Sequence, residues 1–335
     1  MSPRRERSKI NPVTPLDQLP PGPNKPIFVG GTGRSGTTVL GRLLGQHKDI
    51  ALTFPMELTF FSDKGGLADT YWWSQPVDTT ILSRREIAHR VRRLQYSLTK
   101  PHRWVGSPEY FVERLQSHWF KRKGPTGAPR GLHRSTSKAL VEEAAAEYAA
   151  TFETEPLAAS RRLASRLIDP MAESEGKERW VDTSPTNALV AHKLYPVFPD
   201  AKFIHIMRDG RDAAASVVSQ MWGPDDMERA LRWWRRRMIQ SKRSLMYVPS
   251  DQVLVIQLED LVTRDREGSI SRLLGFLGVE DDPNMRAWFD EVVTPRKGNE
   301  GRWRRDYTGE QLDVIDTAYA EIIADLEARE IPHPV

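Results

Sequence analysis

The sequence contains no cysteine, and this absence excludes whole classes of chemistry. A chain without cysteine has no disulfide framework, no thiol nucleophile and no thiolate metal site. It also lacks any apolar run of about 18 residues, the length that a membrane-spanning helix needs. No apolar segment of the kind found in secretory signals follows the basic start of the chain. These absences predict a cytoplasmic protein.

Net charge is the second property of which the chain has little. Lys and Arg number 49 against 45 Asp and Glu, which gives a formal net charge of +4. Residues 1–26 hold five basic and two acidic residues, a surplus of three, so the remaining 309 residues carry only +1. Duplex binding takes roughly 6–10 phosphate contacts in typical cases, so we expect no nucleic-acid partner. The proline-rich residues 1–26 are predicted to form a disordered basic tail.

Short apolar runs alternate with helical stretches through the rest of the chain. Buried strands are expected at four runs, residues 27–29, 179–182, 202–207 and 252–257. Helices between strands imply crossover connections, so the sequence predicts a P-loop-like three-layer α/β fold. Its central, mainly parallel sheet is flanked by helices. We expect one domain over residues 27–335, with a mostly helical insertion at 67–175.

A glycine-rich loop follows the first predicted strand and leads into a helix. Backbone N–H groups and the helix start make such a loop an anion site. Gly31 and Gly36 have the spacing of a nucleotide P-loop, but Thr37 and Thr38 stand where an NTPase has Lys and then Ser or Thr. Arg34 is the cation of the loop. A loop without that Lys suits a group less charged than a triphosphate with its Mg²⁺.

A second basic element begins at Arg208, which follows the strand expected at 202–207. Ligands of open α/β sheets bind at the carboxyl ends of strands. Ser216 lies eight residues further on, and an Arg and a Ser hydroxyl can share one phosphate. The alternative is a salt-bridged turn, in which Arg208 and Arg211 pair with Asp209 and Asp212.

A third element lies near the C-terminus, where Arg296, Lys297 and Gly298 are followed by Gly301 and Trp303. A basic run is usually a solvated surface. Here the glycines and the tryptophan that follow it favour a flexible cationic loop that folds over an anion.

The three elements together resemble the PAPS-dependent sulfotransferase family in their order and spacing, PAPS being 3′-phosphoadenosine 5′-phosphosulfate. The resemblance implies that the 5′-phosphosulfate is bound by the first loop, through Gly33, Arg34, Ser35, Gly36, Thr37 and Thr38. It implies that the 3′-phosphate is bound by Arg208, Ser216, Arg296, Lys297 and Gly298. The Arg-Ser-Gly-Thr-Thr loop looks more like the tyrosylprotein and Golgi-type branches and their bacterial relatives, whereas the Arg-Lys-Gly loop is similar to the cytosolic type.

The activity that this resemblance implies is transfer of a sulfuryl group from PAPS to a hydroxyl, by in-line attack at sulfur, with PAP as the product. The acceptor is expected to be a small molecule, a glycan or a lipid, and no metal is expected. Arg34 and the loop N–H groups would stabilise the charge that develops on the bridging oxygen.

The same resemblance suggests Glu57 as the base that takes the proton of the acceptor hydroxyl. Glu57 is the only carboxylate in the apolar stretch 54–61, and apolar surroundings would make it a stronger base. Cytosolic relatives use a histidine instead, and four candidates stay open: His102, His133, His192 and His205. We expect His205, inside a predicted strand, to be a core residue.

One position departs from the family pattern, since Thr183 stands where many relatives have a Lys that contacts the sulfuryl group. Either Thr183 or Ser184 donates a weaker hydrogen bond, or another cation reaches into the site. Two other functions compete with sulfuryl transfer: a P-loop kinase of a small hydroxyl substrate, and a non-catalytic nucleotide-binding module.

Overall fold

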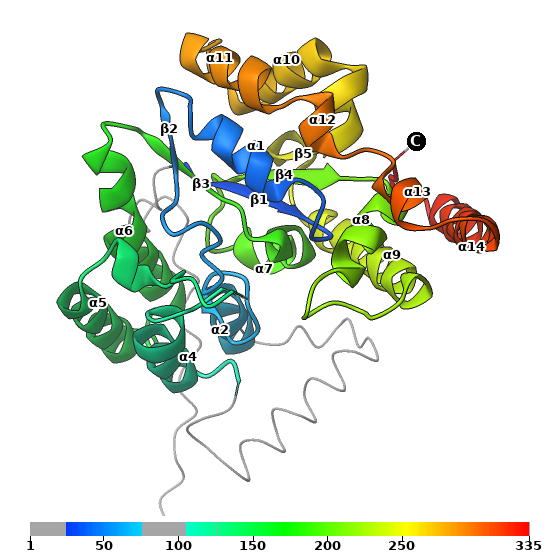
Figure 1. The fold of residues 1–335 in the computed structure, drawn as a ribbon. Coiled ribbons are helices and arrows are strands. Elements are labelled where there is room, and N and C mark those ends of the chain that lie inside the picture. Colours follow the sequence, from blue (N-terminus) through cyan, green and yellow to red (C-terminus); the bar gives the residue numbers. More distant parts are fainter. Residues whose placement is uncertain (1–24, 76–104, 125, 335) are drawn as a thin grey trace, which may run out of the picture.

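The computed structural model describes residues 25–75, 105–124 and 126–334. At its centre is a five-stranded sheet in which every strand pair is parallel, in the order β2-β3-β1-β4-β5. The strands are β1 (Ile27–Gly31), β2 (Ile50–Leu52), β3 (Arg179–Asp182), β4 (Lys202–Met207) and β5 (Val253–Gln257). Helices cover both faces (Figure 1), so the predicted α/β class is confirmed. The sequence analysis missed β2, which has only three residues.

Alternate side chains of the strands separate two cores. Ile27 and Val29 of β1 pack with Ile204 and Ile206 of β4 on one face, under three helices. These are α1 (Thr37–Leu44), α10 (Arg266–Leu277) and α11 (Pro283–Val292). Phe28 points to the opposite face, as the two-residue period of a strand requires.

The opposite face carries an aromatic core. The Phe28 ring centroid lies 5.6 Å from that of Trp180 and 5.5 Å from that of Phe203. Helices that follow β2 in the chain contribute to this core. They are α2 (Leu67–Ser74), α4 (Pro108–Arg114), α5 (Lys138–Thr151) and α6 (Pro156–Ser174), with the π-helical turn Leu115–Trp119 and the 3-10 turn Leu132–Arg134. Residues 76–104 of the insertion expected at 67–175 lie outside the described residues.

A third cluster packs beside β4, around Trp234, Trp303 and Tyr319. Its main helices are α8 (Gly210–Val218), α9 (Met227–Leu245) and α14 (Glu310–Glu327), and the short α12 (Pro295–Gly298) and α13 (Arg302–Asp306) precede α14. The short α7 (Ala191–Leu194) and the turns Pro185–Leu189, Ser250–Gln252 and Asp260–Arg264 complete the described elements. Among the described helices, none is long and apolar enough to span a bilayer.

The order of the strands determines where a ligand can bind. The chain passes from β3 on one side of β1 to β4 on the other, so the connections diverge around β1. In open α/β sheets the crevice at the carboxyl ends of such strands is the binding site. Three loops meet there: residues 32–36 after β1, residues 183–184 after β3, and residues 208–209 after β4.

Phe28→Ala is expected to lower the free energy of unfolding by about 3–5 kcal/mol, because it opens a cavity where several aromatic rings meet. Urea denaturation followed by circular dichroism measures the change. Met221→Ala serves as the control, since that side chain is 97% exposed and should shift stability by less than about 0.5 kcal/mol. A Phe28→Ala protein as stable as the control would contradict this account of the core.

Candidate functional site

The loop between β1 and α1 has the backbone of an anion cradle. Gly33, Arg34 and Gly36 have positive φ angles of 88°, 60° and 101°. A side chain at position 36 would lie 2.8 Å from Leu258, so glycine is needed there for space as well as for conformation. The N–H groups of residues 33–38 donate no hydrogen bond to other parts of the chain that the structure describes. They are therefore available to a bound anion.

Two side chains of this loop add to the cradle. The buried Ser35 hydroxyl has no hydrogen-bond partner among the described residues. Arg34 is partly exposed and donates from Nε to the Ser216 hydroxyl, at 2.9 Å. Burial and the nearby Arg208 and Arg302 guanidinium groups lower the pKa of Arg34, while the carboxylate of Glu57 acts in the opposite direction. Thr37 and Thr38 begin α1.

Arg208 joins all three basic elements. It lies at the end of β4, its residue only 7% exposed, and its guanidinium donates to the carbonyl oxygen of Arg34 at 3.3 Å. It also donates to the carbonyl oxygens of Gly298 and Asn299, at 3.3 and 2.9 Å. Arg34, Arg208, Ser216 and Gly298 are thus brought together, although they are far apart in the sequence. The backbone of Arg296 and Lys297 is in α12, and their side chains lie outside the described part of the structure.

Both arginines of the turn form ion pairs of the kind that the salt-bridged alternative predicts, but only Arg208 also donates to the neighbouring loops. Arg211 pairs with Asp209 at 2.6 Å and stacks between the rings of Trp303 and Tyr319. Its role is structural. Arg208 instead points toward the loops, and its guanidinium is 3.8 Å from a carboxylate oxygen of Asp212.

Asp212 holds the start of α13 against the turn that follows β4. Its buried carboxylate accepts hydrogen bonds from the backbone N–H groups of Gly301 at 2.8 Å and Trp303 at 3.1 Å. The third basic element is therefore held in place by a side chain of the second.

Glu57 has charged neighbours, so the expectation of apolar surroundings is wrong. Its Oε2 lies 3.2 Å from Arg122 and 3.4 Å from Arg130, and Arg122 also donates to its carbonyl oxygen at 2.6 Å. Apolar residues surround Glu57 in the sequence, but the two arginines come from a segment more than 60 residues further along the chain, between β2 and β3. Among the described residues, Oε1 accepts no hydrogen bond.

The buried carboxylate of Asp182 fixes the backbone next to Glu57. It accepts from the N–H of Leu58 at 2.6 Å, from the N–H of Ser184 at 3.2 Å and from the side-chain amide of Asn187 at 2.8 Å. The carboxyl end of β3 thereby sets the position of the segment that carries Glu57.

Thr183 does not replace the family's lysine in a simple way. Its methyl group packs against α1, where a side chain at Gly41 would come within 2.0 Å of it. Within the described part of the chain, the buried hydroxyls of Thr183 and Ser184 have no partner. Both hydroxyls are therefore available to a bound group.

Arg237 of α9 is a cation that the sequence analysis missed. Its guanidinium donates to the carbonyl oxygen of Thr32 at 3.1 Å, beside the first loop, and lies 4.6 Å from the ring centroid of Trp233. Burial lowers the pKa of Arg237 to about 10. The only sequence signal was the four-residue spacing between Trp233 and Arg237, which puts both on one helix face.

Two of the four histidine candidates form hydrogen bonds with other groups, and a third is buried in a strand. His205 is buried in β4, as expected, and burial lowers its pKa to about 4. His192 contacts the Ser244 hydroxyl at 2.9 Å, and a ring nitrogen of His133 lies 2.6 Å from the Phe120 carbonyl oxygen. His102 lies outside the described residues.

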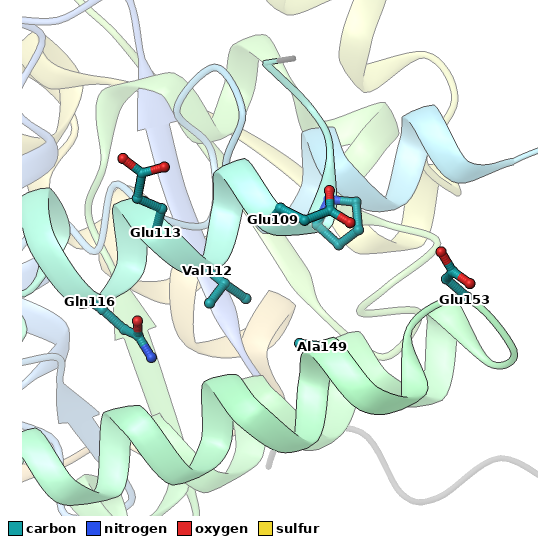
Figure 2. Close-up of a pocket in the computed structure, with 7 residues that line it drawn as sticks. Glu109, Val112, Glu113, Gln116, Ala149 and Glu153 are labelled. Atoms are coloured by element: carbon teal, nitrogen blue, oxygen red, sulfur yellow. The ribbon is translucent and has the colours of Figure 1, made fainter. Parts of the chain in front are cut away.

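A hollow of about 360 Å³ between α4 and α5 is separate from these loops (Figure 2). Glu109, Glu113 and Glu153 line it, together with apolar residues such as Val112 and Ala149. An acidic lining repels phosphate groups, so this hollow does not suit a nucleotide.

Comparison with known proteins identifies the family. The sulfotransferase family model matches residues 26–103 and 97–283, whereas no curated protein matches the sequence. Among solved structures, the chain is similar to the sulfotransferase domain of the Synechococcus PCC 7002 olefin synthase (TM-score 0.46, 20% identity, 95% of this chain and 99% of that one covered).

Two further structures are similar over most of their length. One is the sulfotransferase domain from the curacin biosynthetic pathway (TM-score 0.49, 14% identity, 93% of this chain and 99% of that one). The other is mouse sulfotransferase SULT7A1, complexed with PAP (TM-score 0.42, 13% identity, 91% and 86%). Because the family model covers most of the chain, including the first two basic elements, the chain belongs to the sulfotransferase family.

Proposed function

We propose that this sulfotransferase moves the sulfuryl group of PAPS to a hydroxyl of a small-molecule, glycan or lipid acceptor, leaving PAP. Membership of the family implies PAPS-dependent sulfuryl transfer. The observation that carries the proposal for this chain is the position of Arg208, which contacts both the first loop and the C-terminal loop. One nucleotide with phosphates at two ends suits this arrangement.

The residues present fit such a nucleotide. The free N–H groups of residues 33–38 and the unpartnered Ser35 hydroxyl suit the 5′-phosphosulfate. Arg208 and Ser216 suit the 3′-phosphate, and the family resemblance adds Arg296, Lys297 and Gly298 of α12 to them. When bound, PAPS supplies the sulfuryl group and a phosphate leaving group.

Arg34 and Arg237 are the proposed sources of positive charge at the first loop. Arg34 belongs to the loop, and Arg237 reaches the loop from α9 and bonds the Thr32 carbonyl oxygen. Donors held in position before the reaction stabilise developing charge without a cost of reorganisation. Arg237 therefore supplies the cation that Thr183 cannot.

Glu57 is the proposed base. Arg122 and Arg130 hold one carboxylate oxygen, Oε2, and the other, Oε1, remains available to accept the proton of an acceptor hydroxyl. The hydrogen bond from the N–H of Leu58 to Asp182 places Glu57 at the carboxyl end of β3, the strand next to β1 and its loop. A base here would act next to the residues that bind the phosphosulfate.

Glu57→Gln is expected to lower kcat about 100-fold or more while PAP affinity stays unchanged, because it removes the base and leaves the loop intact. The assay follows radiolabelled sulfate from PAPS into acceptors of a cell extract, and calorimetry measures PAP binding. Glu109→Gln, an exposed carboxylate on α4, is the control and should keep full activity. If Glu57→Gln keeps full turnover, Glu57 is not the base. If the unaltered protein transfers no label to any acceptor, the proposed function is wrong.

Arg237→Ala is expected to lower kcat about 100-fold, the effect typical of removing one preorganised donor. Arg237→Lys should recover part of the activity, since it restores the charge but not the planar guanidinium. The matched control is Arg236→Ala, an exposed arginine one residue away on the same helix. Equal activity of Arg237→Ala and Arg236→Ala would show that the guanidinium of Arg237 has no role in transfer.

A further inference from the structure

The helical insertion contains a concentration of positive charge that the cofactor does not explain. Residues 121–134, called here the basic segment, include no Asp or Glu. Its five basic residues are Lys121, Arg122, Lys123, Arg130 and Arg134. The chain from residue 27 onward has a net charge of only +1, so this surplus is local.

The described residues on the two sides of position 125 in the basic segment pair with each other through their backbones. The N–H of Arg130 donates to the carbonyl oxygen of Arg122 at 2.8 Å, and the N–H of Gly124 donates to that of Ala128 at 2.8 Å. A side chain at Gly131 would lie 2.1 Å from the Phe120 carbonyl oxygen, so this end of the paired residues is closely packed. The backbone positions that carry Arg122 and Arg130 are therefore fixed.

Arg122 and Arg130 lie opposite each other in this pairing, and both reach the same oxygen of Glu57. Like charges in opposite positions of paired strands repel each other. One carboxylate neutralises only one of the two guanidinium groups. The Arg130 side chain is 41% exposed and that of Arg122 only 16%, so Arg130 is the one that a ligand from solvent can reach.

Other cations of the segment lie around this pair. The Arg134 guanidinium stacks on the ring of Phe54, 4.3 Å from its centroid, three residues before Glu57. Lys121 and Lys123 line a hollow of about 290 Å³, with His133, Phe120 and Pro129. Positive charge thus continues from the proposed base to the surface.

We infer that the acceptor carries an oxyanion near its reacting hydroxyl, and that Arg130 binds this oxyanion. A carboxylate, a phosphate ester or a sulfate ester would serve, because a guanidinium pairs with each through two parallel N–H donors. Arg122 then holds Oε2 of Glu57 while Oε1 faces the hydroxyl. The inference rests on the proposed function and adds the chemical class of the acceptor.

The test separates acceptors by charge before sulfation. A cell extract of the source organism is passed over an anion-exchange resin, and the bound and unbound fractions are each incubated with the full-length protein and radiolabelled PAPS. We expect label to be transferred to the bound fraction. Prior treatment of that fraction with alkaline phosphatase, with a sulfatase, or with a carbodiimide and an amine distinguishes the three oxyanions by which treatment abolishes transfer.

Variants test the role of Arg130. For Arg130→Gln, the amount of bound fraction that gives half-maximal transfer should rise about tenfold or more, with a smaller change in the maximal rate. Arg130→Lys should recover part of the loss. Lys138→Gln is the control, because Lys138 lies outside the basic segment, is exposed and pairs with Glu142 on α5.

Acceptor activity in the unbound fraction alone would overturn the inference and leave the proposed function standing. An equal effect of Lys138→Gln and Arg130→Gln would overturn it too, because the charge of the surface rather than one guanidinium would then be responsible. No transfer to either fraction would overturn the proposed function, and the inference with it.

Discussion

The burial of one charged side chain is the constraint on which the site depends. Arg208 lies almost fully within the protein, and a buried guanidinium is costly unless its donors find acceptors. Its acceptors here are backbone carbonyl oxygens of two loops, the first at Arg34 and the second at Gly298 and Asn299. Satisfying Arg208 therefore fixes the distance between those loops. Under the proposed function, that distance has to match the two phosphate ends of one nucleotide.

The acceptor side of the site is built by a second buried charge of opposite sign. Asp182 accepts from the backbone N–H groups of Leu58 and Ser184, and so links the end of β3 to the residue after Glu57. The insertion then adds Arg122 and Arg130, which hold the Glu57 carboxylate. The sheet thus positions both the nucleotide loops and the proposed base. Arg122 and Arg130 supply the positive charge that, in our inference, determines which acceptors bind.

Elements and loops whose signal lies within a few consecutive residues could be predicted from the sequence. A short apolar run followed by a glycine-rich or arginine-containing turn is contained in a few residues, so β1, β4 and the loops after them could be predicted. The strand Ile50–Leu52 could not, because three residues carry too little periodicity to be separated from a turn.

Contacts between distant segments account for what was missed. No pattern near Glu57 in the sequence predicts its contacts with Arg122 and Arg130, because these arginines come close to it only in the folded chain. Arg237 is one of three consecutive arginines, and only the packing of α9 decides that Arg235 pairs with Asp325 while Arg237 reaches the first loop. Local sequence patterns can predict the loops of this site. They cannot predict which side chains from distant segments contact those loops.

We propose that one nucleotide contacts both segments that Arg208 connects, the loop after β1 and the residues around Gly298. Titration calorimetry with PAP, adenosine 5′-phosphate and adenosine 3′-phosphate tests this claim most directly. If each phosphate is held by its own charge-assisted hydrogen bonds, removing either one should weaken binding at least about tenfold relative to PAP. Adenosine 5′-phosphate that binds as tightly as PAP would contradict the account, because the second basic element would then hold no phosphate.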